Sequence, residues 1–363
     1  MHANEQLTVR ALRVRGVEVP LARPIETAAG VMQTTPLVLI DLLTDEGPTG
    51  RSYLRCYTPA ALAPLVRLVD NLAPLLVGAP AEPAAAKARL ARHFRLLGTQ
   101  GLVGVAIAGI DMAVWDALAK ARGQPLAAVL GGEPRPLPAY ATLRAMAPAA
   151  AAAEAEEVVD AGFTALKVKL GGPGDLAADL ATIDAIRRAV GDDVELMVDF
   201  NQSLSIDGAL ARVPALDERG LTWIEEPARA DDFAGHARIA ATARTPIQLG
   251  ENWWGPEDAE KSIAAGASDH ATLDVMKIGG VSGWLRAAAL AEAAGLPASS
   301  HAFVEYSAQL LSVTATAHRL EYADHAGPLL VEPLRAVDGY ALPPTGPGSG
   351  VEWDEQAIEG LQR

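Results

Sequence analysis

The sequence predicts an α/β protein in which a parallel β-barrel follows a small α+β domain. From residue 137 onward, short apolar segments alternate with Ala-rich stretches of helical periodicity, and the apolar segments begin every 24 to 30 residues. A β-then-α unit of that size is typical of a parallel sheet, and seven or eight units in succession close into a barrel. The predicted strands are Leu137–Leu143, Ala165–Leu170, Glu195–Phe200, Leu221–Glu226, Ile247–Glu251, Ala271–Val275 and Leu296–His301.

The first 130 residues show a different pattern. Leu7–Val19 and Leu37–Thr44 are typical of two paired strands. The segment Pro20–Pro36 between them is long for a hairpin turn, so we expect a loop there that serves as a lid or binding loop. The Gly- and Pro-rich run 131–136 predicts the domain boundary. Three stretches before it have helical periodicity, namely Leu62–Leu76, Pro83–Leu97 and Val105–Arg122.

Composition excludes several classes of partner. The chain has 30 Lys and Arg against 45 Asp and Glu, a formal net charge of −15. Because nucleic acids and anionic membranes attract basic surfaces, we expect neither as a partner. The single Cys56 and the lack of an apolar leader predict a cytoplasmic location. The most apolar stretch, 101–119, contains Asp111 and Asp116 and is not expected to span a membrane.

Titratable side chains lie near the carboxyl ends of six successive predicted strands, and one more follows after the next helix. Polar residues often end strands, but seven in phase with the strands favour a shared site, because catalytic groups of parallel barrels converge at that end. The seven are Lys169, Asp199, Glu225, Glu251, Asp274, His301 and Glu321.

Three of these residues predict a metal site. Asp199, Glu225 and Glu251 end consecutive strands, and neighbouring strands lie roughly 4.8 Å apart, so their carboxylates can reach one cation. An all-oxygen set without His or Cys favours Mg²⁺, or else Mn²⁺, over Zn²⁺. The alternative is a buried acid cluster balanced by Arg, which the lack of Arg at these strand ends disfavours. Strand alternation predicts that Glu226 points to the opposite face from Glu225.

Two lysines and a histidine are candidate acid/base groups. Lys167 and Lys169 share one strand face, and two adjacent ammonium groups lower the pKa of one of them, so Lys169 is the predicted base and Lys167 its neighbour that tunes it. Lys167 could alternatively act only as a counterion of the acids. Asp274 is placed to orient His301 for proton transfer. Asn201, two residues after Asp199, is a candidate amide donor to the substrate.

With these residues in place, the sequence resembles the enolase superfamily and, within it, the mandelate racemase group. The resemblance covers nearly the whole chain, from the first strand to about Trp353. The motifs that carry it are KVK (167–169), VDFNQS (198–203), WIEEP (223–227), GENW (250–253), DVMKIGGV (274–281) and SSH (299–301), together with the helix 109–118.

The resemblance implies a modified TIM barrel, (β/α)7β, with an α+β capping domain formed by the N-terminal segment and the C-terminal tail. The corresponding divisions are 1–132, 133–325 and 326–363. The implied chemistry is removal of the proton α to a carboxylate of a small-molecule substrate, through an enediolate stabilised by Mg²⁺. A homo-oligomer is also implied. In the implied roles, Asp199, Glu225 and Glu251 hold the metal, Lys169 and His301 with Asp274 transfer protons, and Glu321 donates a hydrogen bond to the developing oxyanion.

The substrate is predicted less directly. Thr142 stands on the first barrel strand where the family has a small Ser, and Ile25 and Met32 come from the long N-terminal segment, so these three are candidate substrate-binding residues. We expect racemisation of a mandelate-like 2-hydroxy acid. An acid-sugar dehydratase on the same scaffold is the close alternative. A retro-aldol enzyme with a Schiff-base lysine and a non-catalytic, metal-dependent binder of carboxylates are further alternatives.

Overall fold

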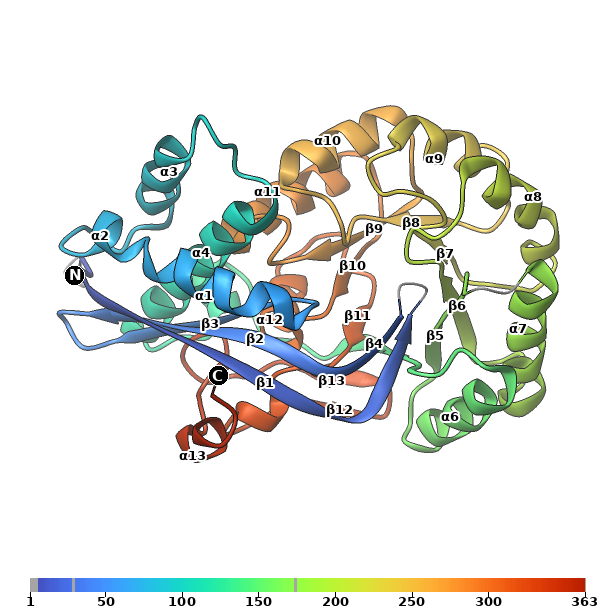
Figure 1. Cartoon of the computed structure of the whole chain (residues 1–363), viewed down its shortest axis with the longest axis horizontal. Coiled ribbons are helices and arrows are strands. Elements are labelled where there is room, and N and C mark those ends of the chain that lie inside the picture. The colour runs from blue at the N-terminus through green and yellow to red at the C-terminus, as the bar shows by residue number, and fades with distance from the viewer. Residues whose placement is uncertain (1–5, 28–29, 173–174, 363) are drawn as a thin grey trace.

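A ring of eight parallel strands forms the larger part of the protein, and an antiparallel sheet with its own helices lies beside it (Figure 1). The structure, a computed structural model, describes residues 6–27, 30–172 and 175–362. The barrel strands are β4 (Leu137–Thr142), β5 (Ala165–Lys169), β6 (Glu195–Asp199), β7 (Ile224–Glu225), β8 (Ile247–Leu249), β9 (His270–Asp274), β10 (Ala298–His301) and β11 (Leu320–Tyr322).

The last strand closes the ring. β11 pairs in parallel with β4, and on its other side the amide of Ser300 donates to the carbonyl of Arg319 at 3.1 Å. One helix follows each strand from β4 to β10, so the described residues form the (β/α)7β barrel that was predicted. The helices are α6 (Pro148–Asp160), α7 (Leu176–Val190), α8 (Ile206–Leu216), α9 (Phe233–Ala240), α10 (Pro256–Ala265), α11 (Gly280–Ala293) and α12 (Val304–Ser312).

The capping domain is built on a three-stranded sheet in the order β1–β2–β3, all antiparallel. Its longest helix, α4, is apolar enough to resemble a membrane span, but 78% of its most apolar window is buried inside the protein. Asp111 of α4 accepts hydrogen bonds from the amide and hydroxyl of Ser282 on α11, so α4 is a core helix between sheet and barrel. The cap elements are β1 (Val9–Thr27), β2 (Gly30–Thr44), β3 (Thr49–Arg55), η1 (Pro59–Ala61), α1 (Leu62–Asp70), α2 (Ala73–Leu76), α3 (Pro83–His93), α4 (Gly101–Ala121) and α5 (Leu126–Val129).

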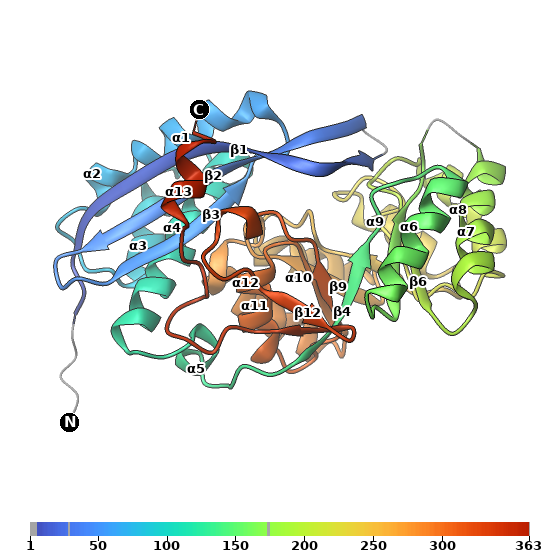
Figure 2. The ribbon, with the colours of Figure 1, turned by 90° about the horizontal axis from the view of Figure 1, so that it is seen from below.

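The expected lid loop 20–36 is instead a continuation of β1 and β2. The two strands stay paired as far as Thr27 and Gly30, with an irregularity between Pro20 and Ile25. The prediction of a loop was wrong because prolines disfavour a central strand. β3 pairs with residues 37–43 of β2, so the described part of this arm is two-stranded and tolerates prolines. The amide of Glu26 donates to the carbonyl of Arg144 at 2.8 Å, so the arm reaches the barrel (Figures 1 and 2).

The C-terminal segment returns from the barrel to the cap, as Figure 2 shows. After η2 (Gly327–Leu329), the hairpin of β12 (Arg335–Val337) and β13 (Tyr340–Leu342) adds to the start of β4. The indole nitrogen of Trp353 then donates to Asp41 of β2 at 2.8 Å. The final helix, α13 (Glu355–Glu359), pairs its Glu355 with Arg15 of β1. The tail therefore adds a hairpin to the barrel sheet at β4 and then packs against the cap sheet.

Candidate active site

The carboxyl ends of the barrel strands open into a cavity of about 1090 Å³ that is also lined by the β1–β2 arm. Glu225 and Asp274 are fully buried and contact residues that line this cavity. The structure therefore brings all the predicted site residues together. Those that line the cavity are Thr142, Lys167, Lys169, Asp199, Asn201, Glu251, His301 and Glu321 from the barrel, with Ile25 and Met32 from the arm.

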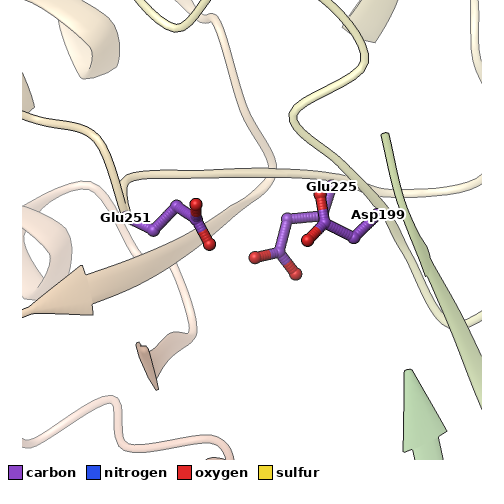
Figure 3. A group of neighbouring side chains, drawn as sticks. All are labelled: Asp199, Glu225 and Glu251. Atoms are coloured by element: carbon purple, nitrogen blue, oxygen red, sulfur yellow. The ribbon is translucent and has the colours of Figure 1, made fainter. Parts of the chain in front are cut away.

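The three predicted metal ligands converge. Each of Asp199, Glu225 and Glu251 offers an oxygen within 4.8 Å of the others, and Figure 3 shows their carboxylates turned toward a common space. Burial, with the charge of Glu251, raises the pKa of Asp199 to about 6. Burial, with the charges of Asp199 and Glu251, raises the pKa of Glu225 to about 8. A divalent cation would relieve this crowding of buried negative charge, and the donors are the hard oxygens that Mg²⁺ prefers. The residues present therefore fit the predicted ion.

Unusual backbone conformations occur close in sequence to the three predicted metal ligands. Gly250 has φ +136°, and a Cβ there would lie 2.3 Å from the carbonyl oxygen of Thr272, so only glycine lets the chain turn Glu251 into the cavity. Asn201 and Glu226, which follow β6 and β7, have φ of 44° and 38°. Non-glycine residues rarely adopt positive φ, and such strain clusters at functional sites.

Lys167 and Lys169 differ in their surroundings. The Lys167 ammonium lies 3.0 Å from Glu225 Oε1 and 3.1 Å from Glu321 Oε1. Burial lowers the pKa of Lys167, but the attraction of Glu225 and Glu321 outweighs it, so this pKa is raised well above the usual value. For Lys169 burial prevails, and the charge of Lys167 adds to it, so its pKa is lowered. Lys167 is thus a fixed cation and Lys169 the titrating amine.

His301 is held by the carboxylate that ends the preceding strand. Its Nδ1 lies 2.7 Å from Asp274 Oδ2, and the other oxygen of Asp274 accepts from the amides of Met276 and Lys277. The free nitrogen, Nε2, faces the acids at 3.4 Å from Glu251 Oε2. Burial lowers the pKa of His301, but Glu251 and Asp274 outweigh it and raise that pKa. In the strand order, β5 precedes the three acid-bearing strands β6 to β8 directly, whereas β10 follows them after β9. Along the sheet, Lys169 and His301 therefore lie on either side of the acids.

Glu321 differs from the expected neutral donor. Its oxygens accept from Thr142 Oγ1 at 2.5 Å and from the amide of Ala302 at 3.0 Å, besides the contact with Lys167. Burial raises the pKa of Glu321, but Lys167 and His301 outweigh it and bring that pKa far below its usual value. In this structure Glu321 accepts hydrogen bonds and contacts the Lys167 ammonium, and its role as a donor to the oxyanion stays a prediction. Thr142 positions Glu321 as well as lining the cavity.

The side-chain amide of Asn201 contacts Asp199, which the sequence did not predict. The side-chain nitrogen and the backbone amide both donate to Asp199, each at 2.7 Å, so they orient that carboxylate. The side-chain oxygen Oδ1 is buried without a partner. Within the cavity lining, Asn201 Oδ1 can therefore accept a hydrogen bond from a ligand, and the expected donation from Asn201 to the substrate stays a prediction.

The prediction from strand alternation, that Glu226 points to the opposite face from Glu225, was wrong. The chain leaves strand geometry at this residue, and Asn252 Nδ2 donates to Glu226 Oε2 at 2.6 Å and to Glu251 Oε1 at 3.2 Å. Glu226 therefore faces the acid cluster without being one of the three converging ligands. Lys277 contacts Asn252 Oδ1 on the other side. The sequence signal that could have identified Lys277 is the rarity of lysine in an Arg-rich chain, where it is one of six.

Comparisons with known families agree with this geometry. Residues 9–131 match the family described as mandelate racemase / muconate lactonizing enzyme, N-terminal domain. Residues 150–357 match the family described as enolase C-terminal domain-like. The two matches fall on the cap and on the barrel, and together they account for most of the chain.

Similar proteins of known structure or activity include more than one reaction. The solved structure of an enolase from Bradyrhizobium, complexed with magnesium and mandelic acid, is 45% identical, covers 99% of both chains and has a TM-score of 0.94. An L-talarate dehydratase from Polaromonas sp. JS666, complexed with magnesium and L-glucarate, is 29% identical over 98% of both chains, with a TM-score of 0.90. The 3,6-anhydro-alpha-L-galactonate cycloisomerase of Streptomyces coelicolor is 31% identical over 96% of this chain and 98% of its own.

Proposed function

The chain belongs to the enolase superfamily, in the mandelate racemase and muconate lactonizing enzyme group, and is a magnesium-dependent enzyme; we propose that it racemises a 2-hydroxy acid by removing and returning the proton α to the carboxylate. The observation that carries the proposal is the placement of Lys169 and His301 on either side of the acids. A proton can then leave one face of a bound carbon and return to the other.

Each residue has a task in this reaction. Asp199, Glu225 and Glu251 would hold Mg²⁺, which would supply positive charge to the substrate carboxylate. Lys169, whose pKa is lowered by burial, accepts the α-proton at Nζ from one face. His301 transfers a proton at Nε2 on the other face, while Asp274 fixes its ring through Nδ1.

Lys167 and Asn201 orient the substrate. Lys167 remains charged beside Glu225 and Glu321, so it can donate to the oxygens on which negative charge develops. The unpartnered Asn201 Oδ1 is suited to accept from the α-hydroxyl. A 2-hydroxy acid therefore matches both the charge and the hydrogen-bonding capacity of the cavity.

Dehydration of an acid sugar is the second candidate. It is favoured by the raised pKa of His301, since Glu251 and Asp274 outweigh burial there and keep the imidazole available as an acid for a leaving β-hydroxyl. The similarity to an L-talarate dehydratase also supports it. Formation of a 2-keto acid would decide for this reaction over racemisation.

The experiment is exchange of the α-proton in deuterated water with Mg²⁺ present, using a panel of 2-hydroxy acids as separate enantiomers. Wild type should exchange both enantiomers of a substrate. Lys169→Ala should lose exchange from one enantiomer and His301→Asn from the other, by about 10²- to 10⁴-fold, because general acid/base groups contribute in that range.

The matched control for this experiment is Lys261→Ala, which removes an exposed lysine whose ion pair, among the residues that the structure describes, is with Asp258 on its own helix. Lys261→Ala should exchange like wild type. Two-base racemisation is refuted if both site variants lose the same enantiomer or if neither loses any. Saturable binding of the acids without exchange in wild type would instead identify a non-catalytic binder.

A further inference from the structure

Arg55, the last residue of β3, is a buried cation that lines the cavity without an acidic partner. It is 8% exposed, and its contacts are Met32 Sδ at 3.9 Å and the ring of Tyr57 at 4.6 Å. Its Nε has no hydrogen-bond partner, and Arg55 forms no ion pair within the described parts of the chain. Burying a charged group without a partner is costly, so such a group points to a ligand that supplies the partner.

The other buried basic side chains show what is missing at Arg55. Lys167 is paired with Glu225 and Glu321. Arg15 lies 3.0 Å from Asp41. Lys277, besides its contact with Asn252, is attracted by Glu251 and Asp274. Arg55 faces the cavity instead, where a guanidinium can hold a carboxylate through two parallel hydrogen bonds.

Two more polar atoms beside Arg55 lack partners. Tyr57 lies between Arg55 and Lys277, whose ammonium is 4.7 Å from its ring centre, and the Tyr57 hydroxyl is buried and unpartnered. Tyr57 has φ 57°, a strained conformation that fixes the ring in this place. His325, after β11, is 8% exposed with Nδ1 unpartnered, and the charge of Arg55 acts on its ring.

These three residues form a polar group of the cavity that is separate from the metal ligands. Arg55 and Tyr57 come from the cap and His325 from the loop after β11, and all three line the same cavity. Lys169 is close enough to both Arg55 and His325 for their charges to interact. A ligand whose α-carbon lies at Lys169 therefore extends toward Arg55, and the cavity of about 1090 Å³ has room for a chain of several carbons.

We propose that Arg55, assisted by Tyr57 and His325, binds a second carboxylate at the far end of the substrate, so that the substrate is a 2-hydroxy dicarboxylate. This inference rests on the proposed function for the position of the first carboxylate. The substrate group that the cap recognises is then an anionic carboxylate rather than the aromatic ring of a mandelate-like acid. The Tyr57 hydroxyl and a His325 nitrogen provide further hydrogen bonds to the same carboxylate.

The test compares equilibrium binding of acids that differ only at the far end. With Mg²⁺ present, the probes are 2-hydroxyglutarate against 2-hydroxypentanoate and 2-hydroxyadipate against 2-hydroxyhexanoate, measured by calorimetry. Wild type should bind at least one of the two diacids at least tenfold more tightly than the monoacid of the same chain length. In Arg55→Gln this ratio should fall to about one, because the glutamine keeps a polar side chain without the charge.

Arg144→Gln is the matched control, since Arg144 lines the same cavity but lies near Asp324. If general attraction by positive charge caused the preference, Arg144→Gln would abolish it equally, and the proposal for Arg55 would be overturned. It would also be overturned if wild type bound diacids and monoacids alike, or if a polyhydroxy monoacid such as gluconate, whose far end is uncharged, gained as much as the diacids.

Folding and turnover are assessed separately from this ratio. Thermal unfolding should show Arg55→Gln at least as stable as wild type, because the substitution removes a buried charge without a partner. Binding needs no turnover, so a diacid preference without deuterium exchange would support the role of Arg55 while contradicting the proposed function. Exchange of monoacids without any diacid preference would support the proposed function while contradicting the role of Arg55.

Discussion

At the scale of single residues, the two lysines of β5 show how neighbours decide the role of an amine. They share a strand face, as their spacing predicted, yet within the described residues only Lys167 forms ion pairs, with carboxylates on three other strands. The pKa of Lys169 is lowered by burial and by the charge of Lys167, whereas Glu225 and Glu321 raise that of Lys167. The first lysine is thus a structural cation and the second a candidate base.

Substitution should separate these roles in the free energy of unfolding. Lys167→Met leaves Glu225 and Glu321 buried without their cation, and breaking a buried pair costs about 3–5 kcal/mol. Lys169→Met removes an amine whose charge burial already disfavours, so stability should change by less than about 1 kcal/mol. Urea unfolding of the metal-free proteins measures the change in the free energy of unfolding for both variants. Equal losses for the two variants would contradict the distinction, and Lys261→Met is a surface control.

The residues that the sequence predicted share one property: each stands at a strand end, in phase with the barrel repeat. Asp199, Glu225 and Glu251 could be placed together because parallel strands end at the same rim. Arg55 and Tyr57 could not, because they lie in the cap and no periodicity connects β3 with the barrel mouth. Glu226 was misplaced because a positive φ, which a strand pattern does not reveal, turns it toward the acids.

At the scale of elements, the β1–β2 arm forms part of the cavity wall that the cap supplies. Ile25 and Met32 pair across the arm and line the cavity, and Glu26 Oε2 accepts from the amide of Met146 at 2.7 Å, which ties the arm to the loop after β4. The sequence predicted that this segment binds substrate, which stays a prediction, but it did not predict strand there. The difference arises because a two-stranded arm tolerates the prolines that a central strand would exclude.

A second contact between cap and barrel joins β3 to α12. The Tyr53 hydroxyl donates to Glu305 Oε2 at 2.7 Å, while Glu305 Oε1 is buried without a partner. Burial, with the charge of Asp324, raises the pKa of Glu305 to about 7. The folded protein therefore retains a proton on Glu305 that the unfolded chain, with its ordinary pKa near 4.5, releases at a lower pH.

This contact predicts a pH dependence of stability. The contribution of Glu305 is fully present below about pH 4.5 and is lost as pH rises through about 7, amounting to roughly 3 kcal/mol at most. Glu305→Gln keeps an acceptor for Tyr53 but cannot ionise, so its advantage over wild type should grow between pH 5 and 8. Urea unfolding at several pH values measures this difference. Parallel curves for the two proteins would contradict the assignment.

At the scale of the whole molecule, the C-terminal tail connects the two parts of the site. The tail leaves the barrel after β11. Two stretches of the tail then pair with each other, because the amide of Val331 donates to the carbonyl of Glu352 and the amide of Asp354 donates to the carbonyl of Leu329. Trp353 then reaches Asp41 of β2, which also accepts from Arg15 and Arg51. Because β1 and β2 carry the arm over the cavity, the tail stabilises the position of the arm relative to the barrel mouth.

Removing the Trp353 side chain should therefore loosen the cap more than the barrel. Trp353 is 5% exposed, and truncating a buried tryptophan costs about 3–5 kcal/mol. In Trp353→Ala, amide hydrogen exchange followed by mass spectrometry should accelerate about 100-fold in β1, β2 and α13 and change little in β6 to β8, since the barrel strands pair with one another. Trp353→Phe keeps most of the buried area and loses only the hydrogen bond to Asp41, so its effect should be about tenfold. Uniform acceleration across the chain would mean that cap and barrel open as one unit, and unchanged exchange in β1 and β2 would mean that the tail does not hold the cap.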